Sequence, residues 1–121
     1  MQDYANFGMF LSEKRRDRGI SSLQTSELAG ISPGYYCDIE KNRKPPPDRE
    51  ILDKILAALR LSEDDTVKFY DLAGEARAGV SPDLPDYIME NEYVRVALRI
   101  AKEKATADDW IQFADKLKKK E

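Results

Sequence analysis

Basic side chains gather in two stretches near the start of the chain, and these are the residues best suited to bind an anion. They are Lys14, Arg15, Arg16 and Arg18 in the first stretch, and Lys41, Arg43 and Lys44 in the second. Residues 1–47 carry seven Lys/Arg and six Asp/Glu, a net charge of +1. Residues 48–92 carry five Lys/Arg and twelve Asp/Glu, a net charge of −7, and residues 93–121 carry eight Lys/Arg and five Asp/Glu, a net charge of +3. The net charge of the whole chain is −3. Because distribution matters more than the total, the first third remains open to a nucleic-acid contact.

Catalytic and metal-binding chemistry is poorly represented. The chain has no histidine and one cysteine, Cys37. It therefore lacks the commonest general base and the commonest metal ligand, and the usual zinc-ligand spacings are excluded. No nucleophile is clustered with a base, so the sequence disfavours an enzyme and predicts no cofactor and no metal.

The length of 121 residues fits one domain, or a small domain with an extension. No apolar run approaches the roughly eighteen residues of a membrane span. The residues from Met1 to Tyr4 lack the pattern of a signal peptide. A lone cysteine fits a reducing compartment. The sequence therefore predicts a cytoplasmic protein without a membrane segment.

Helical patterns dominate, and no stretch alternates convincingly as a strand, which predicts an all-α fold. The first third is expected to hold three helices, at about residues 4–18, 22–29 and 33–41. Gly19 and Gly30 end the first two helices. A capping box that begins at Ser21 opens the second helix, and Ser32 with Pro33 opens the third.

Further helices are expected after the break at residues 45–47. A fourth helix is capped by Asp48, and others follow at about residues 63–73, 85–89, 92–104 and from Thr106 onward. We therefore expect a five-helix domain at residues 1–74 and a helical extension at residues 75–121. The last helix has an apolar face around Trp110 and Phe113, which either forms a dimer seam or packs on the earlier helices.

Two short helices joined by a tight glycine turn lie between Ile20 and Glu40, which is the pattern of a helix-turn-helix. In that motif the second helix lies in the major groove, with its N-terminal residues toward the base edges. Spacing alone leaves a second interpretation open, because bundles that bind nothing contain similar helices and turns.

Seventeen positions carry a resemblance to a known family: Phe7, Gly8, Arg15, Gly19, Ile20, Ser21, Gly30, Ile31, Ser32, Pro33, Tyr35, Asp38, Ile39, Glu40, Arg43, Pro46 and Pro47. In these residues the chain resembles the XRE family of lambda-repressor-like and Cro-like domains, over about residues 7–72. The resemblance implies a five-helix domain that binds operator double-stranded DNA as a homodimer, usually to repress transcription.

The same resemblance implies three sets of functional residues. The base-reading face would consist of Pro33, Gly34, Tyr36, Cys37 and Asp38. The DNA backbone would be contacted by Ser22, Ser32, Lys41, Asn42, Arg43 and Lys44. A structural ion pair between Arg15 and Glu40 would tie the first helix to the third, since arginine pairs bidentately with carboxylate.

The expected reading face is chemically poor. Pro33 and Gly34 offer no side-chain donor, and Asp38 can only accept, for instance from a cytosine amino group. Either DNA shape carries the specificity, or specific binding is weak. Because the expected reading face has few hydrogen-bonding side chains, a rival function remains open: the chain could be an antitoxin-like or anti-repressor module that kept the fold to bind a protein partner.

The second helix raises a related question. Thr25 and Ser26 occupy positions where the family usually has leucine and alanine in its core, whereas Leu23 and Leu28 fall on the outer face. Either this helix is rotated so that the leucines turn inward, or the leucines form an exposed strip that binds a partner.

Overall fold

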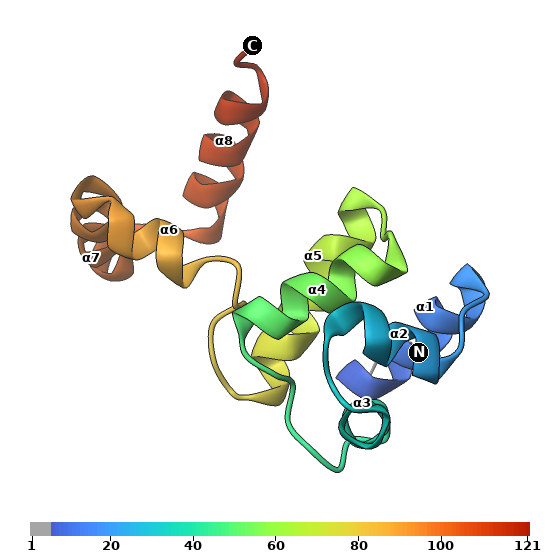
Figure 1. Cartoon of the computed structure of the whole chain (residues 1–121). Helices are drawn as coiled ribbons and strands as arrows, with labels where there is room; N and C mark the ends of the chain where they lie inside the picture. Colours follow the sequence, from blue (N-terminus) through green and yellow to red (C-terminus); the bar gives the residue numbers. More distant parts are fainter. Residues whose placement is uncertain (1–5) are drawn as a thin grey trace. The chain divides into compact units, whose positions relative to one another are not determined.

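The computed structural model describes residues 6–121, and helices are the only regular elements in that range. They are α1 (Phe7–Arg18), α2 (Ser22–Ala29), α3 (Pro33–Glu40), α4 (Arg49–Leu59), α5 (Glu63–Ala76), α6 (Pro85–Glu90), α7 (Glu92–Lys104) and α8 (Ala107–Lys118) (Figure 1). The all-α prediction is confirmed. None of these helices is both long and apolar enough to cross a membrane.

Helix ends follow the predicted caps. The Ser21 hydroxyl accepts from the Gln24 amide at 3.0 Å, and the Gln24 side chain accepts from the Ser21 amide at 2.8 Å. Gly19 and Gly30 end α1 and α2 with φ of 78° and 72°, a conformation that costs other residues more. The predicted start of the first helix at Tyr4 lies outside the described residues; α1 begins after Asn6, whose side chain accepts from the Met9 amide.

The chain divides into two compact units, one that ends at Pro85 and one at Asp86–Glu121. The core of the first unit contains buried side chains from α1 to α5: Phe7, Phe10, Leu11, Ala29, Tyr36, Ile39, Leu52, Ile55, Leu59, Phe69, Tyr70 and Ala73. The rings of Phe7 and Phe69 lie 5.3 Å apart and so join α1 to α5. This core holds the first three helices in place.

The first unit extends beyond the boundary expected at residue 74. Arg77 donates through Nε to the carbonyl of Pro46 at 2.8 Å. The Gly79 amide donates to the carbonyl of Gly74 at 2.8 Å, and Ser81 donates to the carboxylate of Asp71. These bonds hold the segment after α5 against the end of that helix, although its sequence has the composition of a linker.

Helix α2 turns its two leucines outward and two hydroxyl side chains inward. Thr25 and Ser26 are fully buried, while Leu23 is 51% and Leu28 63% exposed. The buried hydroxyls donate to the carbonyls of Ser21 and Leu23 at 2.9 and 2.7 Å, so burial leaves no hydroxyl unsatisfied. The interpretation that α2 is rotated is therefore wrong.

The predicted ion pair between Arg15 and Glu40 is confirmed. Arg15 donates through Nε and Nη2 to the two Glu40 oxygens, at 2.6 and 3.1 Å. Its Nη1 donates to the carbonyl of Ile20 at 3.1 Å. The hydrogen bond to Glu40 raises the pKa of Arg15, against the lowering effect of burial. One guanidinium thus joins α1 to the end of α3 and to the turn before α2.

Gly8 allows α1 to approach α3 closely. A Cβ at this position would lie 2.1 Å from the Glu40 carbonyl oxygen. Any residue other than glycine would therefore clash with the backbone of α3. The Gly8 amide donates to Asn42 Oδ1 at 3.3 Å, and Asn42 Nδ2 donates to Asn6 Oδ1 at 3.0 Å. The loop after α3 is therefore fastened to the start of α1.

Removing one partner of the Arg15–Glu40 pair should destabilise the first unit. We expect Glu40→Ala to lower the free energy of unfolding by about 3 kcal/mol, because it leaves a largely buried guanidinium without its carboxylate. The paired change Arg15→Met with Glu40→Leu should recover at least half of that loss. Urea denaturation followed by circular dichroism measures both. Equal losses in the single and paired variants would contradict this role.

Two helical glycines should respond oppositely to alanine. We expect Gly8→Ala to cost about 3 kcal/mol, because the added methyl meets backbone atoms that must move. Gly34→Ala should instead stabilise by about 0.5 kcal/mol, since nothing lies within 4 Å of its added Cβ. Thermal unfolding of the two variants beside the parent measures the difference. A neutral Gly8→Ala would contradict the close approach of α1 to α3.

Candidate nucleic-acid interface

The N-terminal ends of α2 and α3 differ from those of the later helices in charge. Neither helix has an acidic residue in its first turn, whereas each of α4 to α8 has at least one. Free N–H groups and the helix dipole make such an end attractive to a phosphate. Ser22 is the first residue of α2, and Ser32 caps α3 by accepting from the Tyr35 amide at 3.1 Å. The accepting Ser32 hydroxyl keeps its own hydrogen for another acceptor.

Four of the five expected base-reading residues lie at the surface of α3. Pro33 and Gly34 are exposed, and Cys37 and Asp38 are half-buried. The expectation for Tyr36 is wrong, because this residue is fully buried in the core. Tyr36 and Ile39 are three residues apart and so lie on the same face of α3, which packs inward.

The buried Tyr36 hydroxyl lies beside the ion pair of Arg15 and Glu40. Burial, and then the neighbouring Glu40 carboxylate, raise the pKa of Tyr36 well above its usual range. The side chain is therefore a neutral part of the core.

The loop after α3 presents three exposed cations, Lys41, Arg43 and Lys44. Asn42 lies among them with φ of 60°, and both ends of its amide are engaged within the protein. The Arg43 and Lys44 amides donate to the Asp38 carbonyl at 2.8 and 3.3 Å, which turns the chain tightly at the end of α3. This turn places the cationic loop next to the end of α3 at Asp38.

A contact that sequence reasoning missed joins two of the expected site residues. Arg43 Nη1 lies 3.4 Å from Asp38 Oδ1. Opposite charges five positions apart carry no helical signal, since side chains within a helix meet at three and four. The pair forms because the tight turn after Glu40 brings the arginine back toward α3.

Comparison with known proteins indicates the kind of domain to which these helices belong. A helix-turn-helix family model matches residues 11–65. Over 55 residues, the chain is 31% identical to the HTH-type transcriptional regulators SinR of Bacillus subtilis (strain 168) and of Bacillus licheniformis. The matched part is 46% of this chain and 50% of each relative, so the chain spans about half the length of the curated relatives it matches.

A solved structure of a SinR protein/SinI protein complex is 19% identical, with a TM-score of 0.45, and the match covers 93% of this chain and 94% of that one. The family match includes both predicted glycine turns and the two residues that form the Arg15–Glu40 pair. Residues 11–65 are therefore similar to a helix-turn-helix domain.

Proposed function

We propose that this chain is a DNA-binding transcriptional regulator of the cytoplasm that represses by occupying operator DNA, and that it is not an enzyme. The observation that carries the proposal is the family match at residues 11–65, on a domain whose α2 and α3 begin without carboxylates. Phosphates of one strand would bind at those helix ends and at the loop cations Lys41, Arg43 and Lys44. The exposed residues of α3 would then face the base edges.

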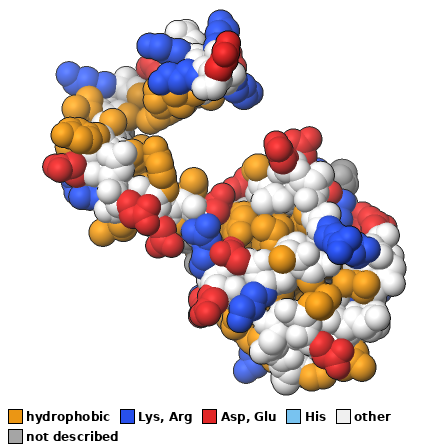
Figure 2. All heavy atoms as spheres, turned by 45° about the horizontal axis from the view of Figure 1, so that its top comes forward, with side chains coloured by type: hydrophobic (Ala, Val, Ile, Leu, Met, Phe, Trp, Pro, Cys, Tyr) orange, Lys and Arg blue, Asp and Glu red, His pale blue; other side chains and the backbone are white. Residues whose placement is uncertain are grey.

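We propose further that the second unit joins two copies of the chain. No residue in α6, α7 or α8 is buried. Large apolar side chains are exposed instead, as Figure 2 shows for this unit: Tyr87, Met89, Tyr93, Val96, Leu98, Ile100, Trp110, Ile111, Phe113 and Leu117. A unit this small without a core is stabilised by association, and such surfaces usually mark an interface.

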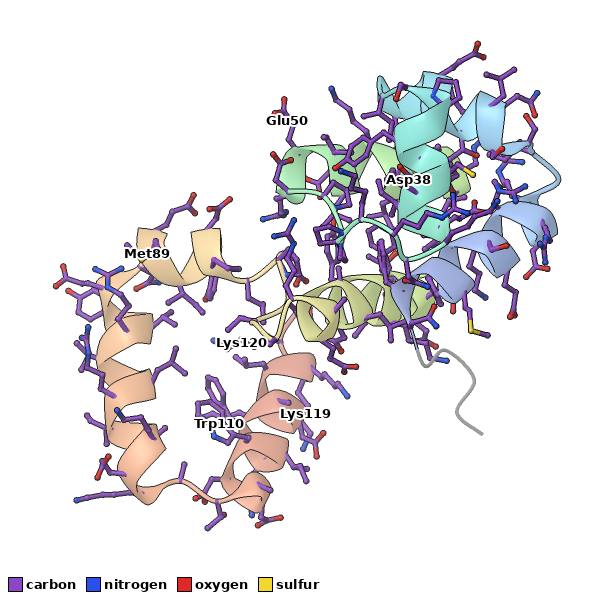
Figure 3. All side chains as sticks on the ribbon, turned by 90° about the horizontal axis from the view of Figure 1, so that it is seen from below. Asp38, Glu50, Met89, Trp110, Lys119 and Lys120 are labelled. Atoms are coloured by element: carbon purple, nitrogen blue, oxygen red, sulfur yellow. The ribbon has the colours of Figure 1, made fainter. Side chains whose placement is uncertain are left out.

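Three of these side chains, Ile100, Trp110 and Phe113, line a groove of about 480 Å³ between α7 and α8. Trp110 extends from α8 toward α7 (Figure 3), and Ile100 and Ala101 of α7 line the same groove. The polarity of α8 favours a second copy as the occupant. Its first turn holds Asp108 and Asp109 and its last turn holds lysines, so two antiparallel α8 helices would pair acidic ends with basic ends.

The proposed backbone contact can be tested at Lys44. We expect Lys44→Ala to weaken binding to every duplex alike and to reduce the slope of log K against log salt by about 0.9, the share of one phosphate. Lys54→Ala removes an exposed lysine from α4 and should leave the slope unchanged. Gel-shift titration against DNA upstream of the gene, at several salt concentrations, measures both. Failure of the parent protein to bind any fragment at low salt would overturn the regulator and favour the antitoxin-like alternative.

The proposed dimer can be tested at Phe113. Phe113→Glu should weaken self-association by about 3 kcal/mol, roughly a hundredfold, because an unpaired carboxylate would be buried in the seam. Val67→Glu puts the same charge at a similarly exposed apolar position of α5, 58% against 52%, and should leave association intact. Sedimentation velocity over a concentration series gives the result. A Phe113→Glu variant that remains dimeric would exclude this interface.

A further inference from the structure

The exposed surface of α3 concentrates its charge in one side chain. Of the four expected reading residues at this surface, Pro33, Gly34, Cys37 and Asp38, only Asp38 is charged (Figure 3). Asp38 lies one helical turn after Gly34, so both residues point to the same side. Nothing lies within 4 Å of a Cβ at Gly34, so the surface one turn before the carboxylate is open.

Arg43 lies beside this carboxylate. Its guanidinium contacts Asp38 at 3.4 Å, yet the Asp38 side chain remains 33% exposed. A carboxylate brought against DNA is repelled by the phosphates, and a cation at this distance offsets that repulsion. The Arg43 amide also donates to the Asp38 carbonyl at 2.8 Å. This backbone hydrogen bond holds the main chain of Arg43 next to that of Asp38.

We propose that Asp38 is a specificity-determining residue that selects cytosine in the major groove, with Arg43 as its positioning residue. The inference rests on the proposed function. An ionised carboxylate can only accept hydrogen bonds. Guanine presents two acceptors in the major groove, thymine one acceptor and a methyl group, and adenine a donor beside an acceptor. Cytosine presents a donor alone, so it is the one base edge that offers the carboxylate attraction without repulsion.

A selection from a randomised duplex pool tests this assignment. We expect the selected sites to share a cytosine that the parent protein prefers about tenfold over other bases. This preference lies toward the lower end of the range of discrimination that a specific base contact provides. Replacing that base with N4-methylcytosine, which puts a methyl group where the amino hydrogen faces the groove, should abolish the preference.

Asp38→Asn supplies a decisive variant because asparagine both donates and accepts, as an adenine edge requires. The preferred base should change from cytosine to adenine, and binding to unrelated duplexes should strengthen several-fold as phosphate repulsion is lost. Asp17→Asn makes the same charge change at an exposed position of α1 and should leave the preferred base unchanged. Arg43→Ala should lower the cytosine preference as well as the affinity, and Arg43→Lys should restore the preference.

Two failures are distinguishable. If the parent protein binds no duplex at low salt, both the proposed function and the role of Asp38 are overturned. If it binds with a base preference that Asp38→Asn leaves unaltered, the regulator stands and the assignment of Asp38 is wrong.

Discussion

The bidentate contact between Arg15 and Glu40 is the constraint on which the geometry of the first unit depends. Through hydrogen bonds from Arg15, this contact joins three parts of the chain: the last turns of α1, the turn at Ile20, and Glu40, the last residue of α3. Helices of eight residues, such as α2 and α3, are too short to be stable alone and take their positions from tertiary contacts. The guanidinium satisfies both a carboxylate and a backbone carbonyl, which compensates the cost of largely burying the charge.

The contacts that hold α3 in place all lie on its inner side, so the residues on its outer side are not needed to position the helix. Tyr36 and Ile39 face the core and Glu40 faces Arg15. Pro33 and Gly34 on this outer side are exposed, and nothing lies within 4 Å of a Cβ added at Gly34. Substitutions at Gly34 should therefore cost little stability.

Local signals made much of this fold predictable. Serine and aspartate caps, glycine turns and the proline at the start of α3 act within a few residues, so the sequence indicates them directly. The Arg15–Glu40 pair was predictable only through family resemblance, since its partners are 25 positions apart.

Features that depend on distant backbone were missed. Helical spacing alone does not say which of Tyr35 and Tyr36 faces the core, because that depends on how α3 packs against the other helices. The contact of Gly8 with Glu40, the return of Arg43 toward Asp38 and the attachment of Arg77 to Pro46 likewise arise only once the helices are packed.

The proposed reading surface and the proposed association of the second unit would complement each other. One carboxylate per half-site would discriminate bases modestly, so a single copy would hold DNA mainly through phosphate contacts that are the same everywhere. Joining two copies turns the second binding event into an intramolecular one, which raises overall affinity by about 10² to 10⁴ without a new contact to the bases. It also makes the spacing of half-sites a source of specificity. The apolar surface of α7 and α8, exposed in one copy, would then be as necessary to operator recognition as the residues that face the DNA.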